Sequence, residues 1–569
     1  MADWTFADIW ETVADVLPEA QALVHGTLRE SWSEFNRRAN GLARFLLDAG
    51  CGHQENVAFF LYNGPEYIEA FAACSKASLV HVNTNYRYAA DELVYLWTNA
   101  DAVCVLFHGV FGPTIEGLRS RVPQVHTWLW VDDGSGDCPS WATSYREAVT
   151  VPTGGNVRGP WGRSGDDLVL LYTGGTTGMP KGVMWRQGDV VAIVDRANRR
   201  PLPLDSDLDS DGFSPSVRAR TGAPGPISLA ASPLMHGTGL LNAANTLCLG
   251  GSVVTMTSRR LDVAELLDTV DREGAKNVVI VGDAFAKPIL KALEESPDRW
   301  DLSTLRLMIS SGVMWSSETK QGLLRHIPRL IMIDGFGSSE AIKMGESVSR
   351  KDKPVSTATF TPVPDAVVLT ADGQLVKPGS GEIGRIGLRG HTPIGYYNDP
   401  ERSAATFPII DGVRYSLPGD FATIDADGTI TLLGRGSLCI NTAGEKVFPE
   451  EVEEVLKTHP SVRDAIVVGI PDDRFGQTVT AVVETETDVI FDQDAVIAHV
   501  RARLAHYKAP RSIIVVDDLG RAANGKVDYR LWTDRATLER RDMAISSSDV
   551  SEPETTSVHG ATGAEWTQE

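Results

Sequence analysis

Apolar runs of strand length alternate with stretches of helical periodicity over the first part of this chain. Residues 33–47 and 67–77 carry apolar side chains at helical spacing, and residues 57–61 and 79–82 are typical of buried strands. Further strand candidates lie at 102–107, 168–172, 277–281, 305–310 and 330–334. Alternation on this scale predicts parallel α/β layers, in which ligands bind at the carboxyl ends of the strands.

The pattern changes after residue 356. Strand candidates at 366–369, 382–388 and 429–433 are short and punctuated by glycine, which predicts a small antiparallel barrel or sheet. Beyond residue 435 the sequence indicates a compact α+β unit. Its helices are expected at 449–456 and 494–504, and its strands at 465–468, 479–483 and 513–516.

A chain of 569 residues is too long for one hydrophobic core, so two or more domains are expected. We predict an N-terminal domain over residues 1–434 and a C-terminal domain over residues 435–540. A tail rich in Ser, Thr, Glu and Gly, residues 541–569, is expected to be disordered. The predicted fold class is α/β, with a large N-terminal domain of α/β layers plus a small β-barrel, and a smaller α+β C-terminal domain.

Composition argues against several classes of protein. The 53 basic and 75 acidic residues give a net charge of −22, which argues against a nucleic-acid partner. No apolar stretch approaches the roughly 20 residues of a membrane-spanning helix, and the first residues lack the pattern of a secretory signal. The six cysteines have no Cys-x-x-Cys spacing, and we interpret them as free thiols of a cytoplasmic protein.

A loop rich in glycine and threonine follows the strand candidate at 168–172. It consists of Thr173, Gly174, Gly175, Thr176, Thr177 and Gly178, and Lys181 comes three residues later. Closely spaced backbone N–H groups, hydroxyl groups and one cation are suited to binding a polyphosphate. The loop is not a Walker A loop, because Pro180 stands where that motif requires glycine before the lysine.

Further polar motifs follow this loop along the chain. They are Asp334-Gly335-Phe336-Gly337-Ser338-Ser339-Glu340, Tyr415-Ser416-Leu417-Pro418-Gly419-Asp420, Gly434-Arg435, Gly444-Glu445-Lys446-Val447 and Asn524-Gly525-Lys526. Each motif taken alone is also compatible with an ordinary turn or a solvated loop. In this order they resemble the adenylate-forming superfamily, which includes acyl-CoA synthetases, aryl-CoA ligases, luciferases and peptide-synthetase adenylation domains. The resemblance spans about residues 25–535.

The resemblance assigns a nucleotide site to the second motif. It implies that Phe336 stacks on adenine, that Ser339 contacts the α-phosphate and that Glu340 holds a magnesium ion. The ion would offset the negative charge that develops on the α-phosphate. Asp334 and Gly337 are assigned to the same site as members of this motif.

The remaining motifs receive roles by the same resemblance. Asp420 would accept both ribose hydroxyls and Arg435 would contact the ribose as well. Lys526 is the implied catalytic lysine, which would meet the substrate carboxylate and the α-phosphate together. Gly444 and Lys446 border the implied tunnel for the coenzyme A thiol, where glycine permits a close approach.

Residues 232–239 resemble the segment that closes the carboxylate end of the acyl pocket, with His236 as its gate. No aspartate stands there to pair an amino group, which disfavours an amino-acid substrate. Residues 184–185 and 439–447 resemble actinobacterial fatty-acyl-CoA synthetases, some of which take steroid side-chain acids. The glycine-rich segments 381–384 and 395–400 are interpreted as scaffold.

The resemblance therefore implies an ATP-dependent acyl-CoA synthetase with a mobile C-terminal lid. ATP, Mg²⁺ and coenzyme A are the expected cofactors, and the expected substrate is a long-chain or bulky apolar carboxylic acid, either fatty or a steroid side chain. Two alternatives stay open: an acyl-AMP ligase that delivers to a carrier protein, and a non-catalytic paralogue that only binds nucleotide. A homodimer is compatible with the sequence.

Overall fold

The computed structural model describes residues 4–173, 179–198, 223–313, 315–352, 359–442, 445–472, 476–487, 489–522 and 525–548. Contacts divide the chain into two compact units, and the division falls between Ser437 and Leu438. The segment Gly520–Val527 groups with the larger unit, although the residues on both sides of it belong to the smaller one. The domain limits predicted at residues 434 and 540 stay a prediction.

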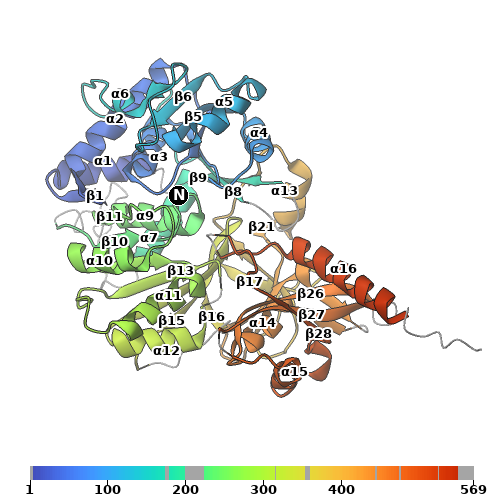
Figure 1. Cartoon of the computed structure of the whole chain (residues 1–569). Helices are drawn as coiled ribbons and strands as arrows, with labels where there is room; N and C mark the ends of the chain where they lie inside the picture. Colours follow the sequence, from blue (N-terminus) through green and yellow to red (C-terminus); the bar gives the residue numbers. More distant parts are fainter. Residues whose placement is uncertain are drawn as a thin grey trace, which may run out of the picture. The chain divides into compact units, whose positions relative to one another are not determined.

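One sheet of the larger unit has eight strands in the order β19-β9-β8-β4-β3-β5-β6-β7. Figure 1 labels its strands β5, β6, β8 and β9. The strands from β8 to β7 are parallel, and β9 and β19 are antiparallel additions at one end. The bounds are β3 (Asn56–Phe60), β4 (Val80–Asn83), β5 (Ala102–His108), β6 (Thr127–Val131), β7 (Thr143–Ser144), β8 (Leu168–Thr173), β9 (Lys181–Arg186) and β19 (Gly395–Tyr396). Every residue of β3, β4 and β6 is buried, as expected for parallel strands that helices cover on both faces.

Helices alternate with these strands along the chain, as the sequence predicts. Their bounds are α1 (Phe6–Val16), α2 (Trp32–Asp48), α3 (Pro65–Ala77), α4 (Ala90–Asn99), α5 (Gly112–Leu118), α6 (Tyr145–Ala148) and α7 (Gln187–Asn198). Ser31 caps α2 by accepting from the backbone N–H of Glu34, so the cap lies two residues before Ser33, where the expected helix begins.

The second sheet of the larger unit has fifteen strands and begins as a parallel sheet. Its first part runs in the order β2 (Leu28–Ser31), β1 (Gln21–His25), β11 (Ser252–Thr255), β10 (Ile227–Ala230), β12 (Asn277–Ile280), β13 (Leu307–Ser311) and β14 (Ile331–Ser338). All neighbours from β1 to β14 are parallel, and only the edge strand β2 is antiparallel. The associated helices are α9 (Gly237–Cys248), α10 (Val263–Glu273), α11 (Gly282–Glu295) and α12 (Ser317–His326).

The same sheet continues from β14 into antiparallel strands. They are β15 (Ala341–Ser349), β16 (Thr359–Pro362), β23 (Ile430–Arg435), β22 (Asp420–Ile424), β18 (Gly384–Arg389), β21 (Val413–Ser416) and β20 (Ile409–Ile410), with β17 (Ala366–Leu369) paired to β18 and the helix α13 (Pro400–Thr406) nearby in sequence. The strands expected after residue 356 are therefore antiparallel, as predicted. They join the large sheet through β14, β15 and β16, a connection that the sequence pattern does not reveal.

The smaller unit is an α+β structure around a five-stranded sheet in the order β25-β24-β27-β26, with β28 paired to β27. Its strands are β24 (Ile440–Thr442), β25 (Glu445–Val447), β26 (Val462–Asp472), β27 (Gly476–Thr485) and β28 (Ser512–Val516), and its helices are α14 (Pro449–Lys457), α15 (Gln493–Arg501) and α16 (Tyr529–Ser548). Helix α16 continues past residue 541, the expected start of the tail, and residues 549–569 lie outside the described residues. The predicted fold class, α/β with a smaller α+β unit, is confirmed.

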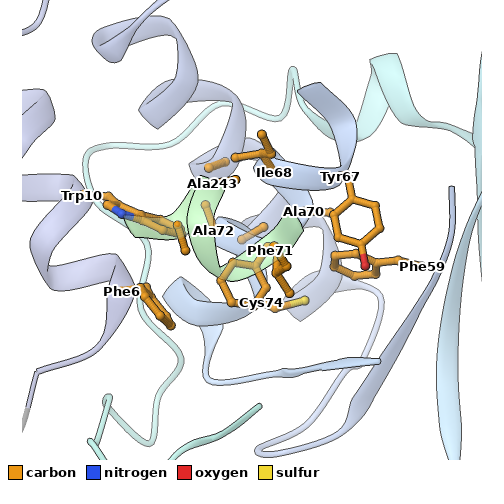
Figure 2. Close-up of a cluster of buried hydrophobic side chains, with 14 of the residues drawn as sticks. Phe6, Trp10, Phe59, Tyr67, Ile68, Ala70, Phe71, Ala72, Cys74 and Ala243 are labelled. Carbon is orange, nitrogen blue, oxygen red and sulfur yellow. The ribbon is translucent and has the colours of Figure 1, made fainter. Parts of the chain in front are cut away.

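Aromatic side chains of α1 and α3 form part of the main hydrophobic core of the larger unit (Figure 2). Phe6 and Trp10 stack with ring centroids 5.3 Å apart, and Phe6 lies 5.5 Å from Phe71. On β3, Phe59 meets Tyr67 edge-on at 5.2 Å. These buried rings attach α1 and α3 to the eight-stranded sheet, where each contributes large apolar area to stability.

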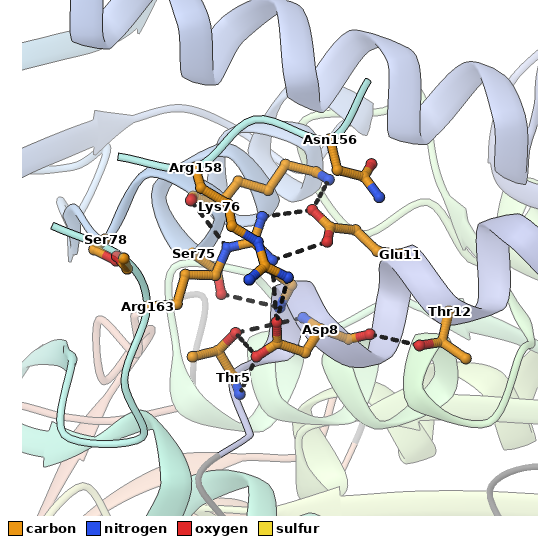
Figure 3. Close-up of polar contacts among 12 residues, drawn as sticks. Thr5, Asp8, Glu11, Thr12, Ser75, Lys76, Ser78, Asn156, Arg158 and Arg163 are labelled. Carbon is orange, nitrogen blue, oxygen red and sulfur yellow. Dashed lines mark hydrogen bonds and ion pairs between the residues drawn. The ribbon is translucent and has the colours of Figure 1, made fainter. Parts of the chain in front are cut away.

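Buried charges hold α1 against α3 and the segment before β8 (Figure 3). Glu11 accepts from the Lys76 ammonium at 2.6 Å and from both terminal nitrogens of Arg163 at 2.6 and 2.8 Å. Arg163 also reaches Asp8 at 3.1 Å. Burial alone would raise the pKa of Glu11, but Arg163 and Lys76 outweigh it and the pKa is lowered. The carboxylate is therefore ionised and fully paired.

None of the helices in the described part of the chain combines the length and the apolarity that crossing a membrane requires. The six cysteines all lie among the described residues and none forms a disulfide there, and four of them are buried.

Candidate active site

The strands β8 and β9 form the hairpin that carries the predicted phosphate-binding loop, residues 173–178, which we call the phosphate loop. Thr173 and Lys181 are paired across it, so the loop between them closes where both strands end. Gly174, Gly175, Thr176, Thr177 and Gly178 lie outside the described residues. The Lys181 ammonium lies 5.5 Å from the centre of the Tyr396 ring, which belongs to the neighbouring strand β19.

The motif that begins at Asp334 occupies the second half of β14 and the turn into β15. Because β14 pairs with β15 up to Ser338, the strand is longer than the predicted 330–334. Phe336 packs against Phe360 with centroids 5.4 Å apart. Gly337 cannot carry a side chain, because a Cβ atom there would lie 2.4 Å from the carbonyl oxygen of Ile342.

Three side chains from separate strands fix the turn at Ser339 and Glu340. The indole nitrogen of Trp185 on β9 donates to the carbonyl oxygen of Ser339 at 2.8 Å. The hydroxyl of Ser416 on β21 donates to the carbonyl oxygen of Glu340 at 2.6 Å, and the hydroxyl of Tyr396 donates to its Oε1 at 2.7 Å. The carboxylate is therefore held in one orientation beside the phosphate-loop hairpin.

Asp334 is buried within β14 and forms an ion pair with Lys320 of α12 at 3.2 Å. Burial raises the pKa of Asp334 to about 6, and Lys320 opposes this shift. Lys320 is itself almost fully buried and lies 5.4 Å from the ring of Trp315. In this arrangement Asp334 positions β14 against α12, and its contact with a nucleotide stays a prediction.

Asp420 and Arg435 are direct partners across β22 and β23. Paired positions of antiparallel strands face each other across the ladder, so the backbones of the two residues share one small region. Asp420 is buried, with 6% of its surface exposed. The structure thus brings together the two residues that the sequence assigns to the ribose.

Lys526 is exposed at the end of the segment Gly520–Val527, within the larger unit. Its carbonyl oxygen accepts from the N–H of Ala522 at 2.7 Å, which closes a tight turn. Gly525 in that turn has φ of +71°, and a Cβ atom there would lie 2.6 Å from Val313. Glycine is therefore required before the lysine.

His236 stands at the N-cap of α9 and is partly exposed. Burial lowers the pKa of His236 to about 3, and the charges of Lys526 and Arg87 act in the same direction. The imidazole is consequently neutral at physiological pH. A contact of His236 with Lys526 or with the acyl pocket stays a prediction.

The structure describes less of the residues that are predicted to border the coenzyme A tunnel. Gly444 lies outside the described residues, and of Lys446 only the backbone is described, paired with Asn441 between β24 and β25. Likewise only the backbone of Arg435 is described. Within the described ranges, no group of three or more His, Cys, Asp or Glu side chains is placed to hold a metal ion.

Sequence reasoning missed Tyr396, which it interpreted as scaffold, and gave no role to Trp185, Ser416 or Lys320. The hydrogen bonds of Tyr396, Trp185 and Ser416 join strands to a turn that is far away in the chain. Lys320 joins a helix to a strand that follows it closely. The available signal is position: Trp185 follows the phosphate loop on the next strand, and Ser416 stands in the motif that ends at Asp420.

Comparison with known families matches two models to the chain. The model for AMP-binding enzymes covers residues 10–397, and the model for their C-terminal domain covers residues 451–526. The chain belongs to the AMP-binding enzyme family.

Similar proteins extend this result over nearly the whole length. A medium/long-chain fatty acid–CoA and 3-oxocholest-4-en-26-oate–CoA ligase of Mycolicibacterium smegmatis is 37% identical over 96% of this chain and 98% of its own. A 3-oxocholest-4-en-26-oate–CoA ligase of Rhodococcus rhodochrous is 36% identical over 95% of this chain and 98% of its own.

Among solved structures, ATP-bound MatB from Rhodopseudomonas palustris has a TM-score of 0.77 at 24% identity and covers 93% of this chain and 99% of its own. The anthranilate–CoA ligase AuaEII with anthranoyl-AMP has a TM-score of 0.79 at 22% identity and covers 95% of this chain and 99% of its own. At these identities the structures establish the fold.

Proposed function

We propose that this chain is an ATP-dependent acyl-CoA synthetase for a long-chain or bulky apolar acid, either fatty or a steroid side chain. The observation that carries the proposal is the alignment, at about 36% identity over nearly the full length, with ligases named for both kinds of acid. The geometry supports it, because the hairpin that bears Lys181 lies beside the turn that bears Glu340, and Tyr396 contacts both residues.

The reaction has two balanced steps. A carboxylate oxygen of the acid attacks the α-phosphorus of ATP, the bond to the bridging oxygen breaks, and pyrophosphate leaves. The sulfur of coenzyme A then attacks the acyl carbon, its thiol proton is lost, and the bond to AMP breaks. The mixed anhydride is needed because a free carboxylate is a poor electrophile and AMP is a good leaving group.

In the first step, different residues of the chain bind the phosphates, the ribose and the adenine of ATP. Lys181 and the loop from Thr173 to Gly178 bind the phosphates, while Asp420 and Arg435 bind the ribose. Phe336 packs against the adenine, and Gly337 keeps the turn close to it. Lys526 brings the two anionic reactants together, as an electrostatic clamp does in other active sites.

The site suits a magnesium ion. Mg²⁺ is usually held by one or two protein carboxylates together with substrate phosphates and waters. Glu340 supplies one such carboxylate: Oε1 accepts from Tyr396, and the other oxygen has no hydrogen bond among the described residues. When bound there, the ion supplies charge stabilisation at the α-phosphate.

His236 gates the acyl pocket as a neutral side chain, because its lowered pKa leaves it uncharged at the working pH. Neutrality suits an apolar acyl chain, which would pay a desolvation cost beside a cation. Gly444 and Lys446 border the route of the coenzyme A thiol in this proposal. The enzyme is expected to work in the cytoplasm with a mobile C-terminal domain, and a homodimer is compatible with this function.

A screen of pyrophosphate release tests the proposal. The purified chain is incubated with MgATP and fatty, aryl or sterol-derived acids, with and without coenzyme A. Release that requires a fatty or steroid acid, together with a thioester when coenzyme A is present, is the expected result. Acid-dependent release without a thioester would favour an acyl-AMP ligase, and no release with any acid would indicate a non-catalytic paralogue.

A further inference from the structure

Tyr396 occupies a fixed position between two predicted nucleotide motifs. On β19 it pairs with Val183 of β9, one strand away from the phosphate-loop strand β8. Its backbone N–H donates to the hydroxyl of Ser403 at 2.8 Å, and its ring packs against Phe407 with centroids 5.3 Å apart. Only 6% of the residue is exposed. The hydrogen bond to Ser403 therefore fixes the backbone of Tyr396, and the contact with Phe407 fixes its ring.

The ring of Tyr396 contacts a cation, and its hydroxyl group contacts an anion. The Lys181 ammonium lies 5.5 Å from the ring centre, within the range of a cation–π contact. The phenol hydroxyl donates to Oε1 of Glu340 at 2.7 Å, a distance typical of a charge-assisted hydrogen bond. A single tyrosine thus connects the cation of the phosphate loop with the carboxylate of the next motif.

We propose that Tyr396 is a positioning residue that orients Glu340 for a metal–nucleotide complex and holds Lys181 beside it. This inference rests on the proposed function. The phenol occupies Oε1 and directs the remaining carboxylate oxygen away from itself, and that oxygen has no hydrogen bond among the described residues. Outer hydrogen bonds of this kind fix the orientation of metal-binding carboxylates.

If the buried ring of Tyr396 served packing alone, loss of its hydroxyl group would not change metal binding. Replacement by phenylalanine separates the two roles, since it keeps the ring against Phe407 and Lys181 and removes only the hydroxyl. A matched control is the next residue, Tyr397, whose hydroxyl donates to Asp101 at 3.0 Å and accepts from Asn56 at 3.4 Å.

The experiment compares the full chain with the variants Tyr396→Phe and Tyr397→Phe. Binding of Mn²⁺, as a paramagnetic substitute for Mg²⁺, is titrated by electron paramagnetic resonance at saturating ATP. We expect Tyr396→Phe to weaken Mn²⁺ binding about tenfold, the lower end of what loss of such an outer hydrogen bond costs. Tyr397→Phe should bind Mn²⁺ as the unmodified protein does. Equal Mn²⁺ affinity for Tyr396→Phe and Tyr397→Phe would overturn the proposal.

A second measurement distinguishes a folding defect of Tyr396→Phe from a specific effect on Glu340. The effect of Tyr396→Phe is repeated in a Glu340→Gln background, where the hydroxyl has no carboxylate to orient. If Tyr396 acts through Glu340, the second substitution adds little to the first, whereas independent and additive effects would contradict the proposal. Melting temperatures of all four proteins report packing separately.

Acid-dependent pyrophosphate release by the unmodified protein tests the proposed function on its own. Mn²⁺ and ATP binding require no acid substrate, so the tyrosine comparison decides the inference even if no acid is turned over. If the unmodified protein binds no Mn²⁺ in the presence of ATP, the proposed role of Tyr396 is overturned as well.

Discussion

The indole nitrogen of Trp185 donates to the carbonyl oxygen of Ser339 at 2.8 Å, across 154 residues of sequence. Trp185 is fully buried on β9, directly after the phosphate loop, and Ser339 lies in the turn between β14 and β15. The hydrogen bond connects the strand that leaves the phosphate loop with the turn that carries Glu340. Because both ends are fixed, the two motifs keep a constant spacing.

Replacing Trp185 by phenylalanine should remove this connection. The unpaired carbonyl is expected to cost about 1–3 kcal/mol in the free energy of unfolding, measured with urea. ATP affinity, measured by calorimetry, should fall as the turn loosens. Trp161→Phe is the control, because Trp161 also donates to a carbonyl, that of Ala77 at 3.1 Å, but is 37% exposed. If Trp185→Phe and Trp161→Phe lose the same stability and both keep full ATP affinity, Trp185 does not hold the two motifs together.

Asp420→Asn should weaken the binding of ATP and of AMP alike, since both carry the ribose. Loss of a charged hydrogen-bond acceptor costs about 1.5–3 kcal/mol, which corresponds to at least about a tenfold rise in Kd by calorimetry. Asp427→Asn, at an exposed turn after the same strand, is expected to leave both constants unchanged. Equal Kd values for Asp420→Asn and Asp427→Asn would remove Asp420 from the ribose site.

Lys76→Met should destabilise the fold strongly, because Lys76 is 2% exposed and pairs with Glu11 at 2.6 Å. Breaking a buried ion pair from one side costs about 3–5 kcal/mol, and we expect the lower figure because Arg163 still pairs with Glu11. Lys291→Met provides the control: its pair with Glu295 is exposed, and such pairs contribute about 0–1 kcal/mol. Urea unfolding measures both. A similar loss in the two variants would show that the buried pair adds nothing.

Glu30 should make the stability of the larger unit depend on pH. Burial and the adjacent carboxylate of Glu69 raise the pKa of Glu30 to about 9, despite Arg38 nearby. The folded state therefore holds a proton that the unfolded chain releases near pH 4.5. The stability that this proton contributes is complete below pH 4.5 and is lost as the pH rises towards 9.

Glu30→Gln is neutral at every pH and should remove this dependence. Relative to the variant, the unmodified protein should lose up to about 1.4 kcal/mol per pH unit between pH 5 and pH 9. Glu34→Gln is the control, since a hydrogen bond from Arg37 lowers the pKa of the partly exposed Glu34. The stability that Glu34 contributes is lost only as the pH falls below about 4.5, so this variant should run parallel to the unmodified protein between pH 5 and 9. Parallel stability profiles for Glu30→Gln and the unmodified protein from pH 5 to 9 would contradict the raised pKa.

Sequence periodicity located most strands because their apolar runs are short and continuous. The predicted strand at 57–61 corresponds to Asn56–Phe60, and the one at 366–369 has the same bounds in the structure. Strand β14 was cut short in the prediction, because its second half is a polar motif that only the partner strand β15 makes regular. The sequence pattern within β14 does not show that β15 pairs with it.

The same limit applies to the candidate site. Asp420 and Arg435 came from motifs, and the structure pairs their backbones across two strands. The contact between Tyr396 and Glu340 joins two motifs that each look self-contained in sequence. No periodicity or spacing predicts a hydrogen bond between distant strands, so Tyr396 was interpreted as scaffold.

The most direct test of the account separates the two half-reactions in Lys526→Ala. Pyrophosphate release from MgATP and an active acid is measured beside thioester formation from preformed acyl-adenylate and coenzyme A, with the exposed Lys291→Ala as control. We expect Lys526→Ala to abolish pyrophosphate release and to spare thioester formation, and Lys291→Ala to retain both. Equal loss of both half-reactions in Lys526→Ala would contradict the assignment of Lys526 to adenylation.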